Sequence, residues 1–121
     1  MYIENSDNII QDLSFKFAVR VVKFYRYLVD EKREFVLSKQ ILRSGTSIGA
    51  NVRESLHGQS EADFVNKLQI ALKEADETEY WLELFHATNL ISDEEFSSLS
   101  SDVKQLIGTL VKIIKSKKGI Q

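Results

Sequence analysis

Apolar residues recur at spacings of three and four along most of the chain, which is the pattern of one face of an α-helix. They predict four helices, at approximately residues 8–30, 35–57, 61–88 and 93–116. The most regular series belongs to the last of these segments: Phe96, Leu99, Val103, Leu106, Leu110 and Ile113. The chain has no sustained alternation of apolar and polar residues, so we expect no β-sheet.

The breaks between these segments are short and carry helix-end signals. The charged run 30–34 interrupts the first segment, and Gly58 lies where glycine commonly follows a helix C-terminus. Ser60 and Ser92 are each followed three residues later by an acidic residue, as in a capping box. Long helices with short connections favour antiparallel neighbours. The expected fold class is therefore all-α, with a single domain over residues 1–121 that forms an antiparallel up-down-up-down four-helix bundle.

The second and third helices should face each other in a definite register. If they turn at the short break between them, the numbers of facing residues sum to about 118. This register places Arg43 near Glu74 and Asn51 near Lys67. We therefore expect an ion pair between Arg43 and either Glu74 or Glu77.

Two glycines, Gly45 and Gly49, lie inside the predicted second helix. A glycine in a helix interior costs about 1 kcal/mol relative to alanine, so the pair indicates a close crossing, either within the chain or with another copy. The segment is not a phosphate-binding loop, because no lysine followed by serine or threonine comes after it.

Composition narrows the function classes. The sequence has neither proline nor cysteine, which suits long helices and removes disulfides, thiolate nucleophiles and cysteine–metal sites. Its start lacks signal-peptide features, and no apolar run approaches the ~20 residues that span a bilayer. We expect a soluble cytoplasmic protein without a membrane partner.

The net charge of the chain is −2, but the charges are unevenly distributed. Residues 74–102 hold nine acids and no Lys or Arg, whereas five lysines and no acid follow from Lys104. This uneven distribution of charge along the chain affects which partners the protein encounters and does not determine its fold.

Two E-x-x-H motifs, ending at His57 and His86, resemble the motifs of di-metal bundles. The two histidines lie near opposite ends of the third helix, roughly 35–40 Å apart at about 1.5 Å per residue. The ions of a two-metal centre lie about 3.5–4 Å apart. Ser44 and Ser47 have no histidine near them along their helix. We therefore expect no catalytic residue, metal, cofactor or small-molecule substrate, and hence no enzyme.

Two sets of residues are candidates for binding. The first is a stripe of the third helix, which is either a wide core seam or a subunit interface anchored by its tryptophan: Ile70, Glu74, Glu77, Trp81 and Leu84. The second is a set of cations, which is either a solvated face or a phosphate-binding face for RNA or DNA. Its members are Lys16, Arg20, Lys23 and Arg26 of the first helix, with Lys112, Lys115, Lys117 and Lys118, which an antiparallel bundle would bring near the start of that helix.

Three stretches, RSGTSIGANVRE at 43–54, DFVNKLQIALKEADET at 63–78 and YWL at 80–82, resemble the bacterial four-helix-bundle family also called 23S rRNA intervening-sequence proteins. The resemblance implies a bundle that frequently assembles as a ring-shaped homopentamer and has no established catalytic activity. It extends to the accessory variability protein of diversity-generating retroelements, which binds nucleic acid through a basic surface. The residues that match the recurring family pattern are Arg43, Ser47, Asn51, Glu54, Lys67, Lys73, Glu74, Glu77 and Trp81.

The expected function is a non-enzymatic, self-associating bundle that serves as a homo-oligomeric scaffold or adaptor, a pentamer by resemblance. The alternative is an accessory protein that binds RNA or DNA through the cations named above.

Overall fold

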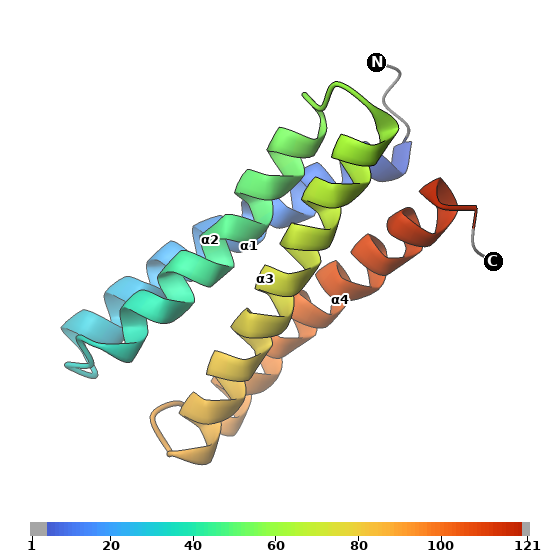
Figure 1. The fold of residues 1–121 in the computed structure, drawn as a ribbon. Helices are drawn as coiled ribbons and strands as arrows, with labels where there is room; N and C mark the ends of the chain where they lie inside the picture. Colours follow the sequence, from blue (N-terminus) through green and yellow to red (C-terminus); the bar gives the residue numbers. More distant parts are fainter. Residues whose placement is uncertain (1–4, 120–121) are drawn as a thin grey trace.

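The computed structural model describes residues 5–119. It contains four helices, α1 (Asn5–Asp30), α2 (Leu37–Ser55), α3 (Glu61–Ala87) and α4 (Asp93–Lys117), and no strand within that range. Each helix packs against two neighbours, in the cyclic order α1, α2, α3, α4 (Figure 1). The predicted all-α four-helix bundle is confirmed.

Contacts across the seams show that neighbouring helices run in opposite directions. Across α2–α3, Arg43 pairs with Glu74, whereas Glu54, further along α2, pairs with Lys67, which comes earlier in α3. The other seams show the same reversal, in the pairs Val21–Gly45 and Ser14–Gly49, Glu79–Ser100 and Phe64–Lys117, and Arg20–Asp102 and Tyr27–Glu95. The connectivity is therefore up-down-up-down, as predicted.

All four helices contribute fully buried side chains to one core. Leu28, Ile48, Leu82 and Leu110, one from each helix, are each 0% exposed. They belong to the apolar series that predicted the helices, so the same period of three and four residues that defines each helix also selects its inward face.

The crossing of α1 and α2 depends on two glycines. A Cβ atom on Gly45 would lie 2.7 Å from a methyl group of Val21, and one on Gly49 would lie 3.2 Å from the backbone oxygen of Ser14. The close crossing predicted from these glycines therefore exists within the chain, where the missing side chains let the two helices approach.

The observed helix boundaries differ slightly from the expected ones. α2 is shorter than the predicted 35–57 at both ends. At its start, Glu34 Oε1 accepts hydrogen bonds from the backbone N–H groups of Val36 at 3.1 Å and Ser38 at 2.8 Å. At its end, residues 56–58 each donate to the carbonyl three residues earlier, which tightens the last turn.

The other helices also differ slightly from the expected bounds. α1 begins three residues earlier than expected, and α3 and α4 each differ from expectation by one residue. Residues 1–4, 120 and 121 of the predicted domain lie outside the described residues.

The turn between α3 and α4 combines two capping devices. Asn89 adopts a left-handed conformation, with φ of 63°, and the N–H of Leu90 donates to the carbonyl of Phe85 at 2.9 Å, as in a Schellman motif. Ser92 and Glu95 form the predicted capping box, in which each side chain accepts a hydrogen bond from the other's backbone N–H. This pair of caps fixes where α3 ends and α4 begins.

None of the helices within residues 5–119 combines the length and apolar character needed to cross a bilayer.

Candidate functional site

The residues of the family pattern meet at the seam between α2 and α3. Arg43 of α2 reaches across to two carboxylates of α3, with its Nη1 atom 3.2 Å from Glu74 Oε2 and its Nη2 atom paired with Glu77. Glu77 Oε2 also accepts a hydrogen bond from Trp81 Nε1 at 3.0 Å. The predicted ion pair is confirmed, and it includes both of the candidate carboxylates.

Electrostatics keep the Glu77 carboxylate charged. The hydrogen bond from the Trp81 indole lowers the pKa of Glu77, and the hydrogen bond from the Arg43 guanidinium lowers this pKa further. Glu77 therefore joins α2 to α3 and also fixes the orientation of the half-buried Trp81.

Ser47, Asn51, Glu54 and Lys67 of the pattern contribute to helix structure and to the α2–α3 seam. Ser47 Oγ donates to the carbonyl of Arg43 at 2.6 Å, and Asn51 Nδ2 donates to the carbonyl of Ser47 at 2.9 Å. Glu54 lies about one turn after Asn51 on α2, and its Oε1 atom is 3.4 Å from Lys67 Nζ of α3. Lys73 is exposed, and it takes part in no ion pair within residues 5–119.

A buried hydrogen bond lies on the core side of this seam. Thr78 Oγ1 donates to Ser44 Oγ at 2.9 Å, and both residues are 0% exposed. Because the side chains of Ser44 and Thr78 are small, α2 and α3 can approach closely enough here for this hydrogen bond to form.

Trp81 lies at the boundary between core and surface. It is half-buried and packs against the core cluster, while the exposed Tyr80 ring meets it edge-on at a centroid distance of 5.1 Å. Ile70 and Leu84 of the same stripe are also half-buried. The stripe therefore contributes to packing, and its use as a subunit interface stays a prediction.

The structure divides the predicted basic face. Lys16 pairs with Asp12 of its own helix at 2.9 Å, Arg20 pairs with Asp102 of α4, and the Lys117 ammonium lies 5.3 Å from the centroid of the Phe64 ring. The others are exposed and form no ion pair within the described part of the chain: Lys23, Arg26, Lys112, Lys115 and Lys118.

An exposed apolar face on α1 and α2 was missed by the sequence reasoning. Phe15 is 58% exposed and Val19 is 39% exposed. Beside Phe15 lies a hollow of about 360 Å³, whose lining includes the small residues Ala18, Gly49 and Ala50. The sequence contains a signal for this face. Phe15 and Val19 are four residues apart, and they lie on the side of α1 that its main apolar series leaves free. We call this surface the α1–α2 face.

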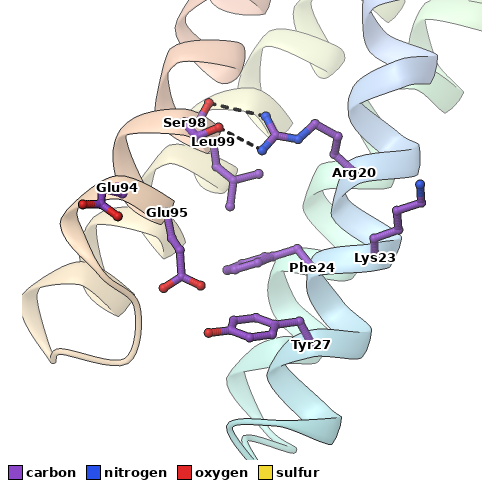
Figure 2. Close-up of a pocket in the computed structure, with 8 residues that line it drawn as sticks. All are labelled: Arg20, Lys23, Phe24, Tyr27, Glu94, Glu95, Ser98 and Leu99. Atoms are coloured by element: carbon purple, nitrogen blue, oxygen red, sulfur yellow. Dashed lines mark hydrogen bonds between the residues drawn. The ribbon is translucent and has the colours of Figure 1, made fainter.

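A groove follows the seam between α1 and α4, which pack less closely than the other neighbouring helices. Its larger hollow, about 480 Å³, is shown in Figure 2: the rings of Phe24 and Tyr27 project from α1 toward α4, and Leu99 projects back from α4. Its smaller hollow, about 280 Å³, has Leu13, Phe17 and Leu106 in its lining. We call the two hollows together the α1–α4 groove.

Polar contacts cross this groove at two places. Arg20 lines both hollows and donates from Nη2 to Ser98 Oγ at 3.0 Å (Figure 2). It also pairs with Asp102 of α4. In the larger hollow, the side-chain hydrogen bond to Glu95 raises the pKa of Tyr27. The backbone N–H of Ser92 lowers the pKa of Glu95, so this carboxylate stays ionised beside the tyrosine hydroxyl.

The two E-x-x-H histidines lie apart, at the turn after α2 and at the end of α3. His86 stacks on Phe96 with 4.4 Å between ring centroids, and its Nε2 atom is 2.6 Å from Asp93 Oδ1. In the part of the chain that the structure describes, no three His, Asp, Glu or Cys side chains gather in a way that could hold a metal ion.

The fold and its seams define a small antiparallel four-helix bundle in which the most distinctive polar residues join α2 to α3. The chain belongs to the 23S rRNA-intervening sequence protein family, whose model matches residues 6–112. It is also similar to a crystal structure of a protein of unknown function from the S23 ribosomal protein family of Bacteroides thetaiotaomicron VPI-5482. The two chains are 57% identical with a TM-score of 0.90, over 91% of this chain and 98% of that chain. No curated protein matches the sequence significantly. The resemblance predicted from three stretches of sequence is confirmed, and neither match indicates an enzymatic family.

Proposed function

We propose that this protein is a non-enzymatic bundle that associates with copies of itself and acts as a homo-oligomeric scaffold or adaptor. The observation that carries the proposal is the α1–α2 face, where Phe15 is 58% exposed beside a hollow that small residues and polar side chains line together. A single chain leaves this surface in water, although contiguous exposed apolar patches usually mark interaction surfaces.

The α1–α2 face offers both parts of a contact between copies. Phe15 supplies a projecting aromatic ring, and the small residues beside it leave a hollow of about 360 Å³. Phe35 and Val36, in the loop that joins the same two helices, are 48% and 71% exposed. An apolar side chain of one copy can therefore enter the hollow of the next, and repetition of such a contact forms a ring when each copy is rotated by an equal fraction of a full turn. The family resemblance supports five copies.

Light scattering after size-exclusion chromatography, at micromolar concentration, tests this proposal. We expect a mass five times the 13.9 kDa of one chain. Phe15→Glu places a charge in the contact and should shift the protein to the monomer mass without loss of helical circular dichroism. The matched variant Tyr80→Glu changes a residue of similar exposure, 55%, on α3, and should leave the assembly intact.

Either of two results would contradict the proposal. The first is that the unmodified protein elutes only as a 13.9 kDa species, which would show that it does not self-associate. Dissociation by Tyr80→Glu with no effect of Phe15→Glu would move the interface to the Trp81 stripe and remove the α1–α2 face from it.

Binding of RNA or DNA is the second candidate function. The observation that favours it is the set of exposed cations that no ion pair engages within residues 5–119, among them Lys112 and Lys115 near the end of α4. Lysines that are already paired gain less from a phosphate, so these unpaired ones are the residues on which nucleic-acid binding would depend.

A further inference from the structure

We propose that the α1–α4 groove binds an amphipathic helix of a partner protein. The apolar stripe of this helix would be flanked by acidic residues along one side and basic residues along the other. The proposal does not rest on self-association, because no residue lines both the groove and the hollow of the α1–α2 face. It follows from the spacing of the two hollows and from the charges on the two walls.

The two hollows are spaced like the side chains of a helix. On α1, residues 20, 23, 24 and 27 line the larger hollow, and residues 13, 16, 17 and 20 line the smaller one. Each residue of the first group lies seven positions after its counterpart, which corresponds to about 10 Å along a helix. Side chains at positions i and i+7 of a docked helix lie the same distance apart and on one face. Two apolar anchors of a partner helix can therefore enter the two hollows together.

The two walls of the groove carry opposite charges at this same interval. Lys16 and Lys23 lie on the α1 wall, seven residues apart, and Glu94 and Asp102 lie on the α4 wall, eight residues apart. Lys16 is paired with Asp12 of its own helix and Asp102 with Arg20, whereas Lys23 and Glu94 form no ion pair in residues 5–119. Flanking charges of this kind select and orient partners along helix seams. The α1 wall fits an acidic flank and the α4 wall a basic one.

The same arrangement disfavours a nucleic acid in this groove. A phosphate backbone that approached Lys16 and Lys23 would also meet, across the groove, the carboxylate of Glu94, which is unpaired within the described residues. Arg20, which bridges the walls between the hollows, is already bound to Ser98 and Asp102. A ligand that carries both signs of charge matches the groove, whereas a polyanion matches one wall only.

Fluorescence quenching with a designed peptide tests the proposal. Because the chain has no cysteine, Gln105→Cys can carry a single bimane label beside the smaller hollow, and Gln40→Cys on α2 can carry the same label as a control. The probe is a synthetic helical peptide with Trp and Leu anchors at i and i+7, glutamates along one flank and lysines along the other. Two comparison peptides carry glutamate on both flanks or lysine on both flanks. Uniform flanks are needed because a peptide with exchanged flanks could bind in the reverse direction.

We expect the mixed peptide to quench the label at Gln105→Cys and not the label at Gln40→Cys. It should bind about tenfold more tightly than either uniform peptide. Lys16→Glu with Lys23→Glu should reverse this preference in favour of the lysine-flanked peptide, whereas the control pair Lys39→Glu with Lys104→Glu should not.

Three outcomes would overturn the proposal. The first is an absence of quenching by any of the peptides. The second is equal affinity for all three, which would mean that the walls select nothing. The third is a change at the Gln105→Cys label when protein concentration alone is raised, which would mean that a second copy occupies the groove.

Discussion

At the scale of single residues, Glu77 is the most connected polar side chain of the candidate site. Its carboxylate accepts from the Arg43 guanidinium of α2 and from the Trp81 indole of its own helix. The Arg43 side chain is 50% exposed and that of Glu77 is 34% exposed, so water weakens their attraction. The gain in stability from such a pair is about 1 kcal/mol or less.

Glu77→Gln tests the charge and keeps the shape. The amide oxygen can still accept from Trp81, so we expect the free energy of unfolding to fall by about 1 kcal/mol or less at pH 7. Because the pKa of Glu77 is lowered in the folded protein, its contribution is present above the unfolded pKa and is lost as pH falls through the folded pKa. Urea titrations should therefore show the difference between the two proteins shrinking from about pH 5 downward. Glu83→Gln, an exposed change on the same helix, is the control. A difference that stays constant at low pH would contradict a role for the charge.

At the scale of elements, the crossing of α1 and α2 is set by the absence of a side chain. Val21 is 1% exposed, and both of its methyl groups would lie within 2.8 Å of a Cβ atom on Gly45. Valine is branched at Cβ and cannot turn away within a packed core. Gly108 of α4 is also inside a helix, but a Cβ atom there would meet nothing within 4 Å.

Substitution of alanine at Gly45 and at Gly108 should change the free energy of unfolding in opposite directions. Gly45→Ala gains helix propensity but forces α1 and α2 apart, so we expect the free energy of unfolding to fall by about 1–3 kcal/mol. Gly108→Ala gains propensity without a clash and should raise it by about 0.5–1 kcal/mol. Thermal or urea unfolding measures both. A stabilising Gly45→Ala would show that the crossing tolerates a methyl group and does not depend on this glycine.

At the scale of the whole molecule, the charge is divided along the bundle. The pairing of Arg20 with Asp102 sets the register of α1 and α4. In this register Lys112 lies beside the N-terminal part of α1, about 20 Å along the bundle from Lys23. The cations that the sequence suggested as one face therefore extend over about 20 Å of the bundle between Lys112 and Lys23, with Lys16 between them.

Nucleic-acid binding can be tested through salt dependence. If about four unpaired cations contact phosphates, affinity for a fluorescein-labelled RNA hairpin should fall about 100-fold between 50 and 200 mM salt. Fluorescence anisotropy measures this fall. Lys112→Glu with Lys115→Glu should reduce both the affinity and the salt dependence, while Lys39→Glu with Lys104→Glu should change them less. RNA binding that is unchanged by Lys112→Glu with Lys115→Glu would contradict nucleic-acid binding through these lysines.

The sequence predicts local features of this protein better than its surfaces. The capping box at Ser92 and the pairing of Arg43 with Glu74 follow from short spacings and from one turn of known length. The exposure of Phe15 and the openness of the α1–α4 seam depend on how far apart helices sit once all four have packed. Periodicity indicates which side of a helix is apolar, but it does not specify which neighbour covers that side. The family pattern likewise marked the α2–α3 seam and gave no signal for either hollow of the α1–α4 groove.

The looser packing of α1 against α4 has a consequence for how the chain folds. The three close seams join helices that are consecutive in sequence, so each can form by closing one short loop. Only the loose seam requires the first and last helices to meet, and loop-closure entropy makes such distant contacts slow to form. Most native contacts can therefore form as successive hairpins, before the two ends of the chain come together.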